Sequence, residues 1–272
     1  AQSVPRITRQ QLQNFHRTYY NASNAQIALV GDLTLEQAKA ISEKVSARLP
    51  RGRAAAMTVA PKASLASKTH IEHPSTQTHI LLAQLAVKRG DPDYPALFLG
   101  NQILGGGGFG TRLMEEVREK RGLTYGIYSS FSPMQASGPF MINVQTRAQL
   151  SEVTLELVQD LLRDYIDKGP TAEELAKAKR ESLGSFPLSA ASNAAIVGQL
   201  AAIGFYDMPL TWMDDFMQDL QNLSVEDVHA AFKRHLNPEQ LVVVTAGPTV
   251  EQLPLPDAVE RAEQDAPVER QH

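Results

Sequence analysis

Cysteine is absent from this chain of 272 residues. Its absence excludes disulfide bonds, thiol nucleophiles and cysteine-type zinc sites. The motifs H-E-x-x-H, H-x-x-E-H and G-x-S-x-G are also missing, so the chain lacks both the zinc helix and the nucleophile elbow of common hydrolases. The nearest approach to a metal pair is His70 and His73, but in an extended segment these side chains point to opposite faces. We therefore predict that this chain binds no metal.

Clusters of positive charge and long apolar runs are lacking too. The formal net charge is -4 and the pI is about 6.0, which argues against a nucleic-acid surface. No apolar run is long enough to cross a bilayer. Hydrophobic residues make up 43% of the chain and charged residues 21%, the ordinary balance of a globular protein. We expect neither a nucleic-acid partner nor a membrane span.

One pattern occurs twice in constant register, in Thr8–Gly31 and in Ser224–Gly247. Each copy begins with a Ser or Thr N-cap and continues as an amphipathic helix. An asparagine follows in the turn, and then an apolar strand that ends in glycine. A match that holds through helix, turn, strand and glycine indicates two copies of one structural unit. If the second copy closes a unit, the first closes an earlier unit that begins upstream of this chain.

Four segments follow from this repeat. We assign 1–50 to the end of a first domain and 51–68 to a linker rich in Ala, Lys and Ser. We assign 69–250 to a second domain and 251–272 to a loose, Pro-rich and acidic tail. We expect the chain to be a product of proteolysis or of a designed truncation, with a short gene product as the alternative.

The second domain has strand patterns at both ends and helical patterns between them. Residues 76–87 are typical of a strand, and 124–131 with 138–146 of an antiparallel pair joined around Pro133. Helical patterns cover 94–104, 111–120, 150–168, 171–188, 193–206, 210–220 and the repeated helix. This order predicts an α+β fold with helices packed on one face of a mainly antiparallel sheet.

The glycine-rich loop Gly105–Gly110 matches G-x-G-x-x-G. A dinucleotide site needs that fingerprint directly after a strand, whereas here it follows a helix. A P-loop would need a lysine before Thr111, and Gly110 stands there. Nucleotide binding is therefore a weak alternative. The other interpretations are a flexible connection between two helices and a bare backbone against which another chain lies.

The stretch Thr111–Tyr125 reads TRLMEEVREKRGLTY. Arg112 and Glu116 form a favourable i,i+4 pair, which marks a solvated helix. From this pattern alone Arg118 is a surface arginine and Tyr125 a residue that favours strands, because isolated surface charges mostly serve solvation.

The same stretch, together with LGNQIL at 99–104 and the glycines, resembles the M16 (pitrilysin and mitochondrial processing peptidase) family of zinc peptidases. Its signature, S/T-R-L-x-x-x-[VL]-R-E-K-R-G-L-x-Y, is long and specific. Most of 69–250 is similar to the second domain of M16B subunits, and 1–50 to the end of the preceding domain. Such subunits resemble two tandem copies of one fold, the LuxS/processing-peptidase-like metallohydrolase fold. The resemblance thus implies roughly 150 further residues upstream.

In this family zinc lies on an H-x-x-E-H helix of one subunit, where a glutamate acts as general base on a metal-bound water. The opposite wall of a closed chamber contributes an Arg and a Tyr seven positions apart, the spacing of Arg118 and Tyr125. The resemblance implies that Tyr125 hydrogen-bonds the scissile carbonyl or its oxyanion and that Arg118 holds the carbonyl and the substrate backbone. It also implies substrate binding by the loop residues Gly105, Gly106, Gly107, Gly108, Phe109 and Gly110.

On this resemblance we expect the non-metal-binding partner subunit of an M16B heterodimer, inactive alone. The partner carries H-x-x-E-H and the zinc, and the substrates are unfolded peptides. Three alternatives stay open: a scaffold like the M16-derived core subunits of respiratory complexes, a subunit whose own upstream part holds the zinc, and a nucleotide-binding module. A pure scaffold would need neither Arg118 nor Tyr125. Similar M16B pairs suggest a bacterial origin and the periplasm, with the cytoplasm as the alternative.

Overall fold

The computed structural model describes residues 3–56 and 59–259. They belong to two compact units, the first formed by Ala1–Val59 with Gly184–Phe216 and the second by Ala60–Leu183 with Met217–His272. The division near residue 59 falls inside the stretch that the sequence assigns to a linker. Most of the predicted tail, from residue 260 on, lies outside the described residues.

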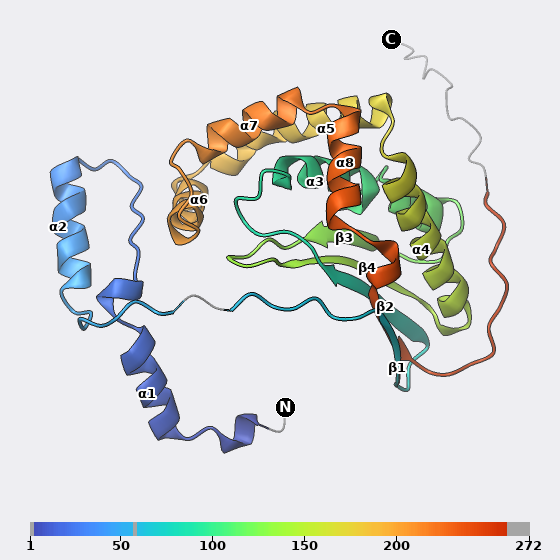
Figure 1. Cartoon of the computed structure of the whole chain (residues 1–272), viewed down its shortest axis with the longest axis horizontal. Coiled ribbons are helices and arrows are strands. Elements are labelled where there is room, and N and C mark those ends of the chain that lie inside the picture. The colour runs from blue at the N-terminus through green and yellow to red at the C-terminus, as the bar shows by residue number, and fades with distance from the viewer. Residues whose placement is uncertain (1–2, 57–58, 260–272) are drawn as a thin grey trace, which may run out of the picture. The chain divides into compact units, whose positions relative to one another are not determined.

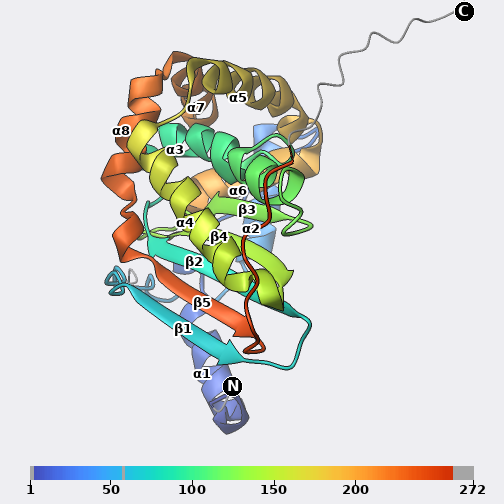
Figure 2. The same ribbon diagram turned by 90° about the vertical axis from the view of Figure 1, so that its right-hand side faces the viewer.

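The second unit is built on one five-stranded sheet. The strand order is β1 (Ser67–Glu72), β5 (Val242–Gly247), β2 (Gln77–Leu85), β4 (Pro139–Arg147) and β3 (Ile127–Phe131) (Figure 2). β1 and β5 run parallel, and every other neighbouring pair is antiparallel. β1 was not predicted from the sequence, because its polar residues SKTHIE show no apolar alternation; all six are exposed.

Helices cover one face of this sheet. α3 (Tyr94–Asn101), α4 (Ser151–Lys168) and α8 (Val225–His235) pack over the same side (Figure 1). The strands alternate accordingly, so Ile80 and Leu82 of β2 are buried under the helices while Leu81 between them is only half-buried. The predicted α+β fold with helices on one face of a mainly antiparallel sheet is confirmed.

An aromatic cluster joins the helices to the sheet. The ring of Phe232 on α8 meets Tyr165 edge-on at 4.9 Å and Phe131 at 5.8 Å between centroids, contacts that each contribute about 1 kcal/mol beyond burial. The buried Tyr165 hydroxyl donates to the carbonyl oxygen of Gly100 at 2.8 Å. A Cβ at Gly100 would lie 2.4 Å from the Phe232 ring. Only glycine therefore lets α3 approach α8 so closely, and this approach fixes where the following glycine-rich loop begins.

Four further helices follow the predicted segments within a few residues: α1 (Arg9–Tyr19), α5 (Ala172–Ser185), α6 (Asn193–Phe205) and α7 (Trp212–Asn222). α2 (Leu35–Ser46) lies in the stretch assigned to the end of the first domain. The helix expected to reach residue 188 ends at Ser185, and Phe186–Ala190 continues as a 3-10 helix that contains Pro187. Among the described residues no single helix is long and apolar enough to cross a membrane. The consecutive segments Ala172–Ala190 and Asn193–Phe205 reach that length and composition only when they are taken together, and the chain bends by 104° between them.

The internal repeat is confirmed in its first half and not in its second. Thr8 and Ser224 each close a capping box at the start of α1 and α8. Asn21 and Asn237 each accept a hydrogen bond from the backbone two residues on, at the start of a short 3-10 helix. The second copy then forms β5, whereas 26–31 forms no strand in the part of the chain that the structure describes. A strand needs a neighbour for its backbone hydrogen bonds, and the described first unit has none to offer.

Candidate functional site

Arg118 lies on a helical segment with unusual geometry. Thr111 starts it by accepting from the backbone N–H of Met114, and Met114–Glu119 is π-helical. Gly122, with φ 60°, ends it and donates to the carbonyl oxygen of Arg118 at 2.9 Å. Single π-helical turns are frequent at functional sites, and a change in helical period alters which residues share a face.

A half-buried ion pair anchors the start of this helix. The Arg112 guanidinium donates to both carboxylate oxygens of Glu174 on α5 at 2.7 Å and to the carbonyl oxygen of Gly169 at 3.1 Å. It also lies over the Tyr165 ring, 4.8 Å from its centroid. The hydrogen bonds that Arg112 donates to Glu174 raise the pKa of Arg112. Burial alone would raise the pKa of Glu174, but the bonds from Arg112 and Thr171 leave it below its ordinary value.

The predicted Arg112–Glu116 pair is wrong, because a tertiary partner replaces the local one. Glu116 accepts from Lys120 at 2.6 Å and from Arg121 at 2.6 Å. Burial would raise the pKa of the Glu116 carboxyl, yet these two hydrogen-bonded cations lower it. The helix around Arg118 is thus fixed at both ends by charged pairs that do not include Arg118.

The glycine-rich loop begins as helix and ends as a turn. α3 continues as a π-helix through Gln102–Gly106, so the first glycines are helical rather than a flexible connection. Gly105 is buried, and a Cβ there would lie 2.6 Å from Ser129 Oγ and 2.7 Å from Leu113. Gly108 and Gly110 have positive φ values of 81° and 80°, which L side chains rarely adopt. Each half of the loop needs glycine, for close packing in the first and for backbone conformation in the second.

Between those two glycines lies Phe109, which is the contact between the loop and Arg118. Its side chain is 71% exposed, and the Arg118 guanidinium lies over its ring at 4.8 Å. Such a cation–π contact at an exposed place is worth about 0.5–1 kcal/mol. It limits the positions that the arginine side chain takes.

Tyr125 projects from a turn that is tied to β4. The Thr124 hydroxyl lies 2.7 Å from the carbonyl oxygen of Gln145 and accepts from the N–H of Gly126 at 3.1 Å. The buried Thr146 hydroxyl donates to the carbonyl oxygen of Leu123 at 2.6 Å. The backbone on both sides of Tyr125 is therefore fixed, while its side chain is 88% exposed.

Arg118 and Tyr125 line one hollow of about 800 Å3. Its other walls are the β1–β2 turn, the end of β4 and the chain after β5, and the lining residues are Ser75, Thr76, Gln77, Gly122, Leu123, Thr124, Gln145, Thr146, Arg147, Ala148, Gln149, Pro248 and Val250. The predicted Arg and Tyr thus lie together, while the glycine-rich loop is absent from the lining and reaches the site through Phe109. Arg147 and Gln145 were not predicted as site residues, because only strand register brings β4 beside the loop of Tyr125.

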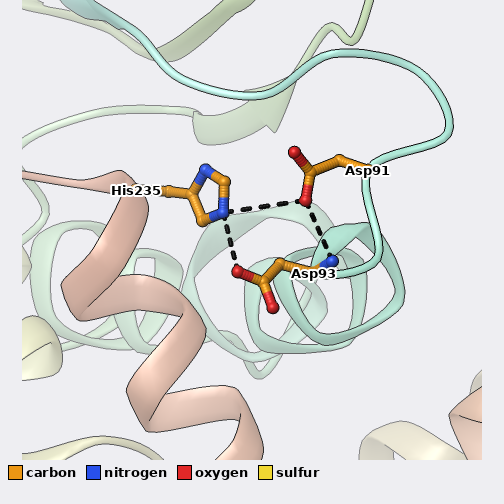
Figure 3. Close-up of side chains that lie close together, drawn as sticks. All are labelled: Asp91, Asp93 and His235. Atoms are coloured by element: carbon orange, nitrogen blue, oxygen red, sulfur yellow. Dashed lines mark hydrogen bonds and ion pairs between the residues drawn. The ribbon is translucent and has the colours of Figure 1, made fainter.

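A cluster of potential metal ligands, Asp91, Asp93 and His235, lies elsewhere, at the start of α3 (Figure 3). His235 Nε2 lies 2.8 Å from Asp93 Oδ2 and 3.9 Å from Asp91 Oδ1. However, the Arg234 guanidinium donates to both carboxylate oxygens of Asp93, at 2.6 and 2.8 Å. These bonds, from Arg234 first and His235 second, lower the pKa of Asp93 against the effect of burial. A cation would have to displace Arg234, so this donor set does not fit a zinc ion and instead ties α8 to α3.

The comparisons with known proteins agree on one family. Residues 6–182 match the family described as "Peptidase M16 inactive domain". A crystal structure of a peptidase M16 inactive domain from Pseudomonas fluorescens has a TM-score of 0.90 and 60% sequence identity, covering 94% of this chain and 61% of that one. A protease structure from Helicobacter pylori, with a TM-score of 0.83 and 20% identity over 91% of this chain and 60% of that one, shares the fold.

The similar sequences include proteins described as peptidases and as non-peptidases. An uncharacterized zinc protease of Mycobacterium bovis is 28% identical over 91% of this chain and 57% of its own length. A protein described as "Non-peptidase homolog YmxG" from Helicobacter pylori is 26% identical over 86% of this chain and 54% of its own length. The chain thus spans little more than half of these relatives. The inactive-domain match implies that the chain holds no catalytic zinc site.

Proposed function

The chain belongs to the peptidase M16 family, and from this premise we propose that it is the substrate-binding part of a zinc endopeptidase whose metal is held elsewhere. Arg118 and Tyr125 would hold the scissile carbonyl of an unfolded peptide. Zinc would be bound by an H-x-x-E-H subunit that pairs with this chain as a heterodimer. The periplasm is the proposed location.

One observation carries the proposal: Arg118 and Tyr125 line the same hollow. They come from a helix and from the turn after it, and each backbone is fixed by its own hydrogen bonds. A phenol hydroxyl and a guanidinium are both hydrogen-bond donors, and the guanidinium keeps its charge at any working pH.

Two donors on backbone that is held in place suit a carbonyl oxygen that becomes negatively charged during peptide hydrolysis. Donors already in place need no reorganisation at the moment of reaction, and losing one commonly costs about 3 kcal/mol. Phe109 supports this role because it holds the Arg118 side chain from the loop side. On this proposal the glycine-rich loop positions Arg118, and its two positive-φ glycines present Phe109.

The second candidate is a non-catalytic scaffold, which the similarity to a non-peptidase homologue favours. A scaffold would not need, in one hollow, an exposed tyrosine and an arginine that has no carboxylate partner among the described residues. The two candidates differ in whether these side chains matter for peptide cleavage.

The test is cleavage of a quenched fluorescent peptide library by the complete natural protein, alone and mixed with an H-x-x-E-H subunit from the same genome. The variants are Arg118→Ala/Tyr125→Phe and the control Arg163→Ala/Tyr20→Phe, which removes an exposed arginine and an exposed tyrosine hydroxyl elsewhere. We expect zinc-dependent cleavage only in the mixture, reduced at least about a hundredfold by the first double variant and unchanged by the control. A first variant as active as the wild type would establish the scaffold instead.

A further inference from the structure

Arg147 is the second arginine of the hollow that contains Arg118 and Tyr125. It is the last residue of β4 and pairs with Gln77 of β2. Along β4 the side chains of Val144 and Thr146 are buried under the helices, while Gln145 and Arg147 are exposed. Strand alternation therefore turns Arg147 to the face that the helices leave uncovered.

The hollow contains positive charge without a matching negative charge. Its lining includes two arginines and no aspartate or glutamate. Among the described residues, neither guanidinium forms an ion pair or a hydrogen bond with a carboxylate; Arg118 lies over Phe109. By contrast, four other arginines of this unit are paired with carboxylates: Arg112, Arg121, Arg163 and Arg234.

Two like charges beside one concave surface raise the local potential and favour an anion there. The neutral groups around them are hydrogen-bonded to one another: Gln145 Nε2 donates to Gln77 Oε1 at 2.7 Å, and Thr124 is bound to the backbone of Gln145. Neither interaction neutralises a guanidinium. The hollow is therefore complementary to a carboxylate, which a guanidinium binds through two parallel hydrogen bonds.

The proposed peptidase role uses only one of these arginines. If Arg118 and Tyr125 bind the peptide carbonyl as proposed, Arg147 at the end of β4 is still without a ligand in the same hollow. We infer that Arg147 determines specificity by binding a peptide carboxylate close to the bond that Arg118 and Tyr125 hold. This inference rests on the proposed function, and it assigns acidic peptides as the substrate class.

A second, smaller hollow of about 320 Å3 continues the site along the uncovered sheet face. It shares Gln145 with the first, and its walls include Leu81, Tyr128, Val244 and Ala246. A peptide with its carboxylate at Arg147 therefore has an apolar surface within reach. An acidic residue close to an apolar one is the pattern that these two hollows fit.

The test is binding, measured by fluorescence anisotropy on the complete natural protein without a zinc-bearing partner. The probes are labelled peptides of one sequence with Glu or Gln at a single position next to an apolar residue, each with an amidated or a free C-terminus. The variants are Arg147→Gln, Arg147→Lys and the control Arg163→Gln. Arg147 has an exposed side chain, and thermal unfolding verifies that each variant folds.

We expect the wild type and the control to bind the amidated Glu peptide about tenfold more tightly than the Gln peptide. We expect Arg147→Gln to bind the Glu and Gln peptides with equal affinity and Arg147→Lys to retain part of the preference for the Glu peptide. A tenfold gain from the free C-terminus alone would identify a terminal carboxylate as the ligand at Arg147. Equal binding of all peptides by the wild type, or a preference that persists in Arg147→Gln, would overturn the inference.

Cleavage in the presence of the zinc-bearing subunit separates this inference from the proposed function. We expect the ratio of kcat/KM for Glu and Gln peptides to fall to about one in Arg147→Gln, while the requirement for Arg118 and Tyr125 persists. If the Arg118/Tyr125 variant cleaves normally and the anisotropy preference stands, the peptidase role fails and the carboxylate site remains.

Discussion

The ion pair between Arg112 and Glu174 offers a direct test of how the helix of Arg118 is held. Glu174→Gln keeps the side-chain shape and removes the charge. The two side chains are 23% and 29% exposed, so water can only partly replace the lost carboxylate. A hydrogen bond to a charged group is worth roughly 1.5–3 kcal/mol, and fully buried pairs lose about 3–5 kcal/mol when one partner is removed. We expect a decrease of about 2 kcal/mol in the free energy of unfolding at pH 7.

The stabilisation by Glu174 should also depend on pH, and the direction follows from its pKa. The folded-state pKa of Glu174 lies below its ordinary value, so its contribution is complete above the unfolded pKa of about 4.3. That contribution is lost as the pH falls through the lowered folded value. The difference between wild type and Glu174→Gln should therefore be constant from pH 7 to about pH 5 and shrink below about pH 4.

Urea unfolding followed by circular dichroism, at pH values from 7 to 3, measures both quantities. Asp160→Asn is the matched control, because it breaks an exposed pair with Arg163 that should change stability by less than about 0.5 kcal/mol. A Glu174→Gln variant as stable as the control at pH 7, or a difference that stays constant into acid, would refute the role given to this pair.

The other predictions concern the glycine-rich loop. Gly105→Ala should lower the free energy of unfolding by about 1–3 kcal/mol, because the added Cβ would lie 2.6 Å from Ser129 Oγ. Gly198→Ala is the control, since this helical glycine has open space where the Cβ would be, and it should be neutral or stabilising. Thermal unfolding measures both variants. Phe109→Ala should leave the melting temperature unchanged, since Phe109 is 71% exposed, yet lower kcat/KM of the reconstituted enzyme about threefold to tenfold through Arg118. Unchanged cleavage kinetics in Phe109→Ala would show that the ring does not position the arginine.

Local signals in the sequence predicted the elements because each depends on neighbouring residues. Thr8 and Ser224 each begin a helix, as their predicted N-cap positions require. β2, β3 and β4 lie where their strand patterns place them. The same signals misjudged 26–31, which has the composition of a strand and no partner to pair with, and missed β1, which is polar but pairs with β5.

What the sequence determined by itself was the family. The signature around Arg118 and Tyr125 is contiguous, so their spacing is visible in one dimension. The residues that surround them are not visible as a pattern in the sequence. Gln145 and Arg147 reach the same hollow through strand register, and Glu174 reaches Arg112 from another helix. Only the tertiary structure brings such distant residues together, since burial and charge pairing act between neighbours in space. It thereby revealed Arg147, the second arginine of the hollow, which has no carboxylate partner in the part of the chain that the structure describes.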